Sequence, residues 1–222
     1  MRMTDHGKPG WFFYLAWGVM SSISIPVALA TYRIVSSLVV GAIGSTIQVG
    51  GQRHITEDFL LPIIFWPALG LVTGLLQYVL LRRYLPRIGW WIGATTLGWS
   101  LGLIGNRLFS LALYGTLDVR AIWFETLMTA LAGGVVGLAQ WLVLHRRVRH
   151  AVFWLPANIL GWGIVGWGAG ILSNRMTIPI VGIMLIPGIA TSIVFWLLLD
   201  RLAPHQGGGR NGPPNHALEL TP

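Results

Sequence analysis

Six long apolar stretches, separated by short polar segments, make up most of the chain. Each has about 20 residues, the length with which a helix crosses the hydrocarbon core of a bilayer. The stretches run over 11–32, 59–81, 90–114, 123–144, 152–173 and 178–199. We therefore predict an all-α fold, a polytopic transmembrane helical bundle with six spans in three repeated hairpins over 11–83, 90–147 and 152–202.

The segments outside these stretches are polar, with one exception. We expect residues 1–10 to form a cytoplasmic N-terminal segment and the glycine- and proline-rich residues 203–222 to form a disordered cytoplasmic tail. The first apolar stretch is too long for a signal peptide. The exception is 34–50, which is apolar but short and rich in glycine and serine. It predicts an extracytoplasmic interfacial or partly re-entrant segment, with a seventh span as the alternative.

The composition supports a membrane location. Hydrophobic residues are 54% of the chain and charged residues only 10%, whereas soluble domains carry about 25% charged residues. The surplus apolar surface must face lipid. The chain has no cysteine, which excludes disulfides, thiol catalysis and cysteine metal sites. The net charge of +8 would suggest nucleic acid in a soluble protein, but here the basic residues lie mainly in short loops, so we expect no nucleic-acid partner.

Those basic residues also predict an orientation, because cytoplasmic loops carry an excess of lysine and arginine. Ten of the 15 fall on one predicted side: Arg2, Lys8, Arg82, Arg83, Arg87, Arg146, Arg147, Arg149, Arg201 and Arg210. The other five are Arg33, Arg53, Arg107, Arg120 and Arg175. We predict a multi-pass protein of the inner (cytoplasmic) membrane with both termini in the cytoplasm.

An internal duplication is the strongest sequence pattern. Residues 72–99 align without gaps on 135–162, an offset of 63, and eleven of the 28 aligned positions are identical. A second match joins 98–107 to 166–175 and ends in Asn-Arg in both copies. The first span matches in two ways: Trp11 and Gly18 are spaced like Trp91 and Gly98, and the segment after Arg33 resembles that after Arg107. We predict three repeats of two spans, related by an axis along the membrane normal.

The repeated segment resembles a loose group of multi-pass bacterial membrane proteins of unknown function. The resemblance is carried by residues 140–147 (QWLVLHRR), by Trp90-Trp91 and by 97–99 (LGW). It covers the second to fifth spans. It implies fold and localisation, and it brings no function with it.

Glycines and tryptophans recur at matching depths. Gly74, Gly137, Gly98 and Gly161 fall in small-xxx-small pairs, which allow close helix packing; the alternative is room for a lipophilic ligand. Of the twelve tryptophans, five fit an interfacial aromatic belt: Trp11, Trp90, Trp91, Trp141 and Trp154. Four fall deeper, where they fill volume opposite glycine or line a ligand site: Trp17, Trp99, Trp162 and Trp167.

Polar residues inside the spans are the candidate sites. Gln77 pairs with Gln140 and Thr95 with Asn158 across the duplication, and such groups in hydrocarbon need hydrogen-bond partners. A polar transport path is the alternative. Arg33, Arg107 and Arg175, with the adjacent Asn106 and Asn174, lie near the extracytoplasmic ends of odd-numbered spans. They could hold an anion such as a lipid headgroup, or snorkel singly to the interface.

The sequence shows no complete catalytic constellation, so we expect a non-enzymatic protein. No acid lies at mid-membrane, and the histidines lie in loops or tails. His145 and His150 could bind a metal or a chlorin, but they more simply act as basic residues near headgroups. No metal site and no particular cofactor is predicted. We expect a structural or accessory subunit, or a binder of lipid or a lipophilic cofactor, with membrane lipids and other membrane subunits as partners. The alternative is a small transporter or channel with an arginine-lined anionic site.

Overall fold

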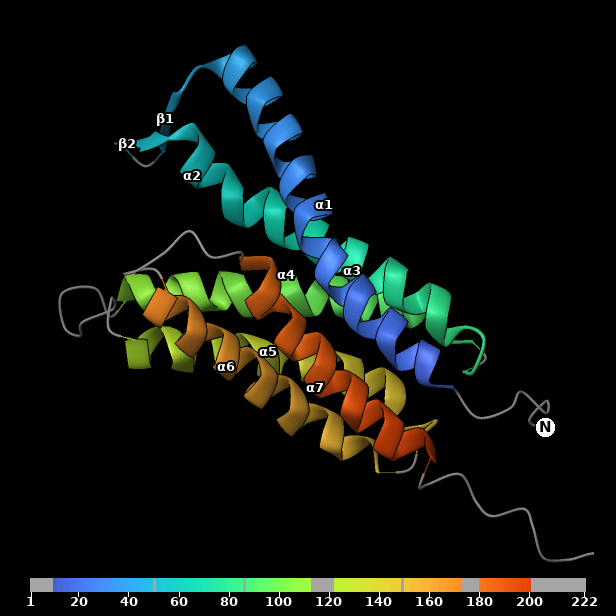
Figure 1. Cartoon of the computed structure of the whole chain (residues 1–222). Coiled ribbons are helices and arrows are strands. Elements are labelled where there is room, and N and C mark those ends of the chain that lie inside the picture. The colour runs from blue at the N-terminus through green and yellow to red at the C-terminus, as the bar shows by residue number, and fades with distance from the viewer. Residues whose placement is uncertain are drawn as a thin grey trace, which may run out of the picture.

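A computed structural model describes residues 10–49, 51–85, 87–112, 122–148, 150–172 and 180–200. In these residues the fold is all-α apart from one small hairpin of strands (Figure 1). The long helices are α1 (Trp11–Ile43), α3 (Trp66–Leu81), α4 (Trp90–Ala112), α5 (Ile122–Leu144), α6 (Trp154–Leu172) and α7 (Ile180–Asp200). The short elements are β1 (Thr46–Val49), β2 (Gln52–Ile55), α2 (Thr56–Leu60), the π-helix η1 (Leu61–Phe65) and the 3-10 helix η2 (Ala151–Phe153).

Four of these helical segments are long and apolar enough to cross a membrane: Trp11–Ile43, Leu61–Leu81, Ile122–Leu144 and Ala151–Gly168. Their outward faces carry many exposed leucines, isoleucines and valines, and large exposed apolar surfaces mark contact with lipid or protein. The chain therefore has the helices of a membrane protein. Two predicted spans, 90–114 and 178–199, coincide with α4 and α7, which are helical but outside that set of four.

The long helices form a closed ring. Along the chain α1 packs on α3, α3 on α4, α4 on α5, α5 on α6 and α6 on α7, and α7 packs back on α1. The closure brings Gly188 of α7 against the backbone of Gly18 in α1. Ser192 of α7 donates a hydrogen bond of 3.0 Å to the carbonyl of Tyr14 in α1. The first and last helices are thus joined by specific contacts, and the ring has an interior.

Of the alternatives for residues 34–50, the re-entrant segment and the seventh span are wrong, and the interfacial location stays a prediction. Residues 34–43 continue α1, which has 33 residues and ends at Gly44 with a φ of 93°, and 46–49 form β1. The segment is therefore neither re-entrant nor a separate span. The glycine and serine content suggested a break in the helix, because these residues are poor helix formers in water. In the structure, the hydroxyls of Ser36 and Ser37 instead donate hydrogen bonds to carbonyls of the preceding turn, and the helix continues.

An arm of the molecule stands away from the other helices. It consists of the second half of α1, the β1–β2 hairpin and α2, which rise from α4–α7 in Figure 1. At the far end of the arm, buried Thr56 joins the two sides of the hairpin where it meets the helices, since its N–H and hydroxyl donate to the carbonyls of Ser45 and Gly44. The π-helix η1 connects the arm to α3. Pro67 has no N–H to bond the turn before it, and such a gap favours a wider turn.

Candidate functional site

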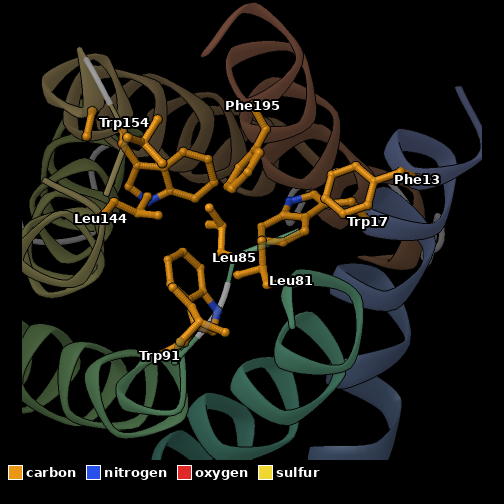
Figure 2. Packing of buried hydrophobic residues seen from close by; sticks show 11 residues of the cluster. Phe13, Trp17, Leu81, Leu85, Trp91, Leu144, Trp154 and Phe195 are labelled. Atoms are coloured by element: carbon orange, nitrogen blue, oxygen red, sulfur yellow. The ribbon is translucent and has the colours of Figure 1, made fainter. Parts of the chain in front are cut away.

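Three tryptophans meet at the centre of one end of the ring (Figure 2). Trp17, Trp91 and Trp154 lie near the starts of α1, α4 and α6, and each is at most 1% exposed. Their ring centroids are 6.1, 5.9 and 5.9 Å apart, with the planes inclined by 64° to 82°. This nearly equilateral triangle closes the interior. The assignment of Trp91 and Trp154 to an interfacial belt is wrong, because inward packing outweighs their position near the helix ends.

Apolar side chains from the other three helices complete this end. Leu81, Leu144 and Phe195 lie near the ends of α3, α5 and α7 and are almost fully buried. Phe195 packs on Trp17 and Trp154 with centroid distances of 5.1 and 5.0 Å. Leu85, from the turn after α3, inserts among the tryptophans, as Figure 2 shows. The end of the bundle is therefore sealed by a dense core.

The predicted polar residues bind these tryptophans. Gln77 accepts a hydrogen bond of 3.0 Å from the indole of Trp91 and donates one of 3.1 Å to Ser21. Gln140 accepts one of 2.9 Å from Trp154 and donates one of 3.1 Å to Thr95. Each glutamine thus joins the helix before it to the helix after it. The two bridges have the same pattern, and their glutamines are 63 residues apart.

A third position, between α6 and α1, differs. Trp17 donates a hydrogen bond of 3.1 Å to Thr191 of α7, where the other two positions have glutamine. The Thr191 hydroxyl donates to its own helix, to the carbonyl of Pro187 at 2.7 Å. Asn158, in the place of Ser21 and Thr95, bonds only the carbonyl of Trp154. The ring of inter-helix bridges is therefore open between α6 and α7.

Trp17 is therefore the equivalent of Trp91 and Trp154 in the first repeat. This corrects the predicted alignment of the first span with the third. Trp17 lies 74 residues before Trp91, the same offset that joins Arg33 to Arg107. The alternative alignment through Trp11 is wrong, because Trp11 is 76% exposed at the outside of the bundle. Ser21 and Thr191 were missed as site residues. The spacing of 74 was the only signal in the sequence that could have identified Ser21.

A small cavity lies next to the tryptophan triangle inside the ring. Its free volume is about 40 Å³, and one water needs roughly 10–15 Å³ on this measure. The lining residues that the structure describes are uncharged. The polar lining residues are Ser21, Ser24, Thr73, Gln77, Gln140, Asn158 and Thr191. Three tryptophans also line the cavity: Trp99, Trp154 and Trp162. The arrangement suits a small neutral molecule that forms hydrogen bonds.

The predicted packing glycines lie at close contacts between neighbouring helices. A Cβ on Gly98 would lie 2.8 Å from the Cα of Val136 in α5. One on Gly74 would lie 3.0 Å from the Cα of Ile92, and one on Gly161 3.2 Å from the Cα of Pro187. Gly137 faces the side chain of Asn158 at 2.9 Å. These glycines hold the helices close enough for the glutamine bridges to form.

A second hollow opens between α4 and α5. It has a volume of about 230 Å³, and its walls are mainly Leu101, Phe109, Leu131 and Val135, all exposed on the outer face. Gly102 packs on the backbone of Ala132, but a Cβ on Gly105 would meet nothing within 4 Å. Among the described residues that line it, Asn106 is the polar one. The hollow is an apolar groove on the surface of the ring, with an amide at one point.

The predicted anion site falls mostly outside the described residues. Arg175, Asn174 and the side chain of Arg107 are not among the described residues. The same is true of the predicted terminal segments, before residue 10 and after residue 200. Arg33 is exposed on α1, at the start of the arm, and Asn106 is half-buried beside the groove. Among the described residues, the cavity lining does not include Arg33.

The histidines near the sealed end do not form a cluster of metal ligands. His145 lies beside Trp141, with ring centroids 4.9 Å apart, and its Nδ1 lies 3.3 Å from the carbonyl of Trp141. His150 has a φ of 59°, and Arg87, at the matching position of the duplication, has 58°. In the described part of the chain, no three His, Cys, Asp or Glu side chains lie close enough to hold a metal ion.

No family model, curated protein or solved structure matches this chain.

Proposed function

We propose that this chain is a non-enzymatic, multi-pass protein of the cytoplasmic membrane that binds a lipid acyl chain in the groove between α4 and α5. It would cross the bilayer six times, as three helical hairpins with both termini in the cytoplasm. The observation that carries the lipid proposal is the open space above Gly105, walled by apolar side chains on the outer face of the ring.

The closed ring supports six spans. α4 and α7 lie between helices that are apolar enough to cross a membrane, and they pack along them. A helix of 23 residues such as α4 is about 35 Å long, enough for a hydrocarbon core of about 30 Å. The tryptophans of α4 lower its hydropathy, but Trp91 and Trp99 face the interior. The part of α4 that would meet lipid is accordingly more apolar than its average.

The orientation is supported by what surrounds the sealed end. The turns after α3 and α5, with Arg82, Arg83, Arg87, Arg146 and Arg147, lie at the same end as the tryptophan triangle. By the positive-inside rule this end faces the cytoplasm. The arm then projects on the other side. α1 is about 50 Å long, at 33 residues, so it would extend well beyond the core unless it is strongly tilted.

The groove has the features of an acyl-chain site. Its walls are apolar and it opens outward, where lipid would lie in a membrane. Gly105 leaves the backbone of α4 uncovered by side chains, and Gly102 lets α4 and α5 approach closely at the floor of the groove. An acyl chain lying in the groove would fill the space next to Gly105. Its outer side would stay in contact with the surrounding lipid.

Native mass spectrometry of the purified full chain tests the proposal. Wild-type protein should retain one or more phospholipids at mild activation. Gly105→Leu should lose the bound lipid while folding normally, because the new side chain enters open space. The matched control is Gly93→Leu on the same helix but outside the groove, where the nearest atom to a Cβ is 3.9 Å away. Equal lipid retention in all three proteins would refute the acyl-chain site.

A small transporter or channel is the second candidate, and the central cavity is the observation in its favour. The cavity is polar and lies on the axis of the ring. Toward one end, however, Trp17, Trp91 and Trp154 fill the interior. Transport would require this layer to open. An uptake assay in proteoliposomes that detected solute flux and lost it on a Trp91→Ala exchange would favour transport over lipid binding.

A further inference from the structure

One of the three equivalent positions in the ring of polar bridges lacks the glutamine amide that the other two have. At two positions a glutamine carboxamide lies between a tryptophan of the next helix and a hydroxyl of the previous helix. At the third position Thr191 has no amide and its hydroxyl bonds its own helix. Thr191 accepts a hydrogen bond from the indole of Trp17 but makes none with Asn158. Both Thr191 and Asn158 line the central cavity.

Polar groups around this space have unused hydrogen-bonding capacity. Thr73 is 7% exposed, and its hydroxyl is the one buried side-chain polar atom without a partner in the described part of the chain. Asn158 is 3% exposed, and its amide oxygen accepts no hydrogen bond there. A buried polar group without a partner costs about 1–3 kcal/mol. Such a cost at Thr73, in a cavity that Asn158 also lines, points to an occupant that pairs with both groups.

We propose that the central cavity binds a small uncharged molecule with a primary carboxamide or urea-like group, which takes the place of the missing glutamine amide. Its N–H groups would donate to the amide oxygen of Asn158, and its carbonyl would accept from the hydroxyl of Thr73. Both partners are more than nine-tenths buried and line the cavity. This site is independent of the acyl-chain groove, which lies on the outer face between α4 and α5.

The cavity restricts the ligand by charge and size. Its described lining has no ionised side chain to balance a charge, and an unpaired ion in such surroundings is strongly disfavoured. The free volume of about 40 Å³ admits only a few heavy atoms. Formamide, acetamide and urea fit both limits. A tertiary amide such as dimethylacetamide has the carbonyl but no N–H, so it lacks the donors for Asn158.

Saturation-transfer difference NMR with acetamide tests this site in the full chain in lipid nanodiscs. Wild-type protein should give a saturable signal that formamide displaces and dimethylacetamide does not. Thr191→Gln supplies the missing amide from the chain, and it should reduce the signal at least five-fold. The matched control is Thr31→Gln, the same exchange at an exposed position of α1, and it should leave the signal unchanged.

A second variant keeps the test decisive if Thr191→Gln does not fold. Thr73→Val has nearly the same shape and removes only the hydroxyl without a partner, so it should fold. The affinity for acetamide should fall about two- to ten-fold, the effect of one hydrogen bond. A wild-type protein without a saturable signal would hold only water in the cavity and overturn the proposal. A signal unchanged in both Thr191→Gln and Thr73→Val would overturn it as well.

Discussion

The indole nitrogen of Trp154 donates a hydrogen bond of 2.9 Å to the side-chain oxygen of Gln140, fourteen residues earlier in the chain. Trp91 and Gln77 make the same contact at 3.0 Å with the same separation. Both glutamines use their nitrogen on the preceding helix. A single side chain thereby satisfies two buried polar groups on two helices, which makes the pair a structural unit of the duplicated segment.

Replacing Gln140 with leucine should destabilise the bundle by about 1–3 kcal/mol, because it leaves the indole of Trp154 and the hydroxyl of Thr95 without this partner. The measurement is thermal unfolding of the purified protein in detergent, followed by circular dichroism. Gln48→Leu, at an exposed position of β1, is the control and should be neutral. A Gln140→Leu protein as stable as the control would mean that the bridge contributes nothing.

Gly98→Leu should destabilise the fold by about 1–3 kcal/mol through overpacking, or prevent folding. A Cβ at Gly98 already lies 2.8 Å from the backbone of Val136, so α4 and α5 would have to separate. Gly105→Leu, two turns further along α4 and in open space, provides the comparison and should be tolerated. Unfolding midpoints in detergent distinguish the two. Equal midpoints for both variants would contradict the close contact at Gly98.

His150→Gly should stabilise the protein by up to about 1 kcal/mol, and His150→Val should destabilise it. His150 has a φ of 59°, and the left-handed conformation costs a non-glycine residue roughly 1–2 kcal/mol, most for β-branched side chains. The side chain is exposed, so its removal loses little packing. Chemical denaturation of the three proteins gives the order directly, and a valine variant as stable as the glycine variant would be inconsistent with that backbone conformation.

Reporter fusions after Gln52, Arg87, Thr116, His150 and Met176 should alternate between the two sides of the membrane, starting outside the cytoplasm. The expectation follows from six spans and the distribution of basic residues. The first two fusions are the most informative, since they flank the segment from α2 to α3. If Gln52 and Arg87 reported the same compartment, the six-span arrangement would be wrong.

The sequence by itself determined the all-α class and the places of the long helices. Hydropathy and the lengths of apolar stretches are local properties, and they located four of the six long helices, α4 to α7, to within two residues. The duplication also identified Gln77 and Gln140 as equivalent polar positions, because identical residues at a constant offset imply identical surroundings. The orientation and the six spans remain predictions from the positions of arginine and lysine.

Only the tertiary structure decided which residues face one another. The first span contains tryptophan at both 11 and 17, and hydropathy alone cannot show which of them points inward. Packing selects Trp17, since only it meets Trp91 and Trp154. The second half of α1 likewise contacts α2 and η1, which a reading of local hydropathy does not include. Thr191 lines the cavity together with Gln77 and Gln140, the glutamines at the other two positions, and these three distant segments come together only when the helices close into a ring.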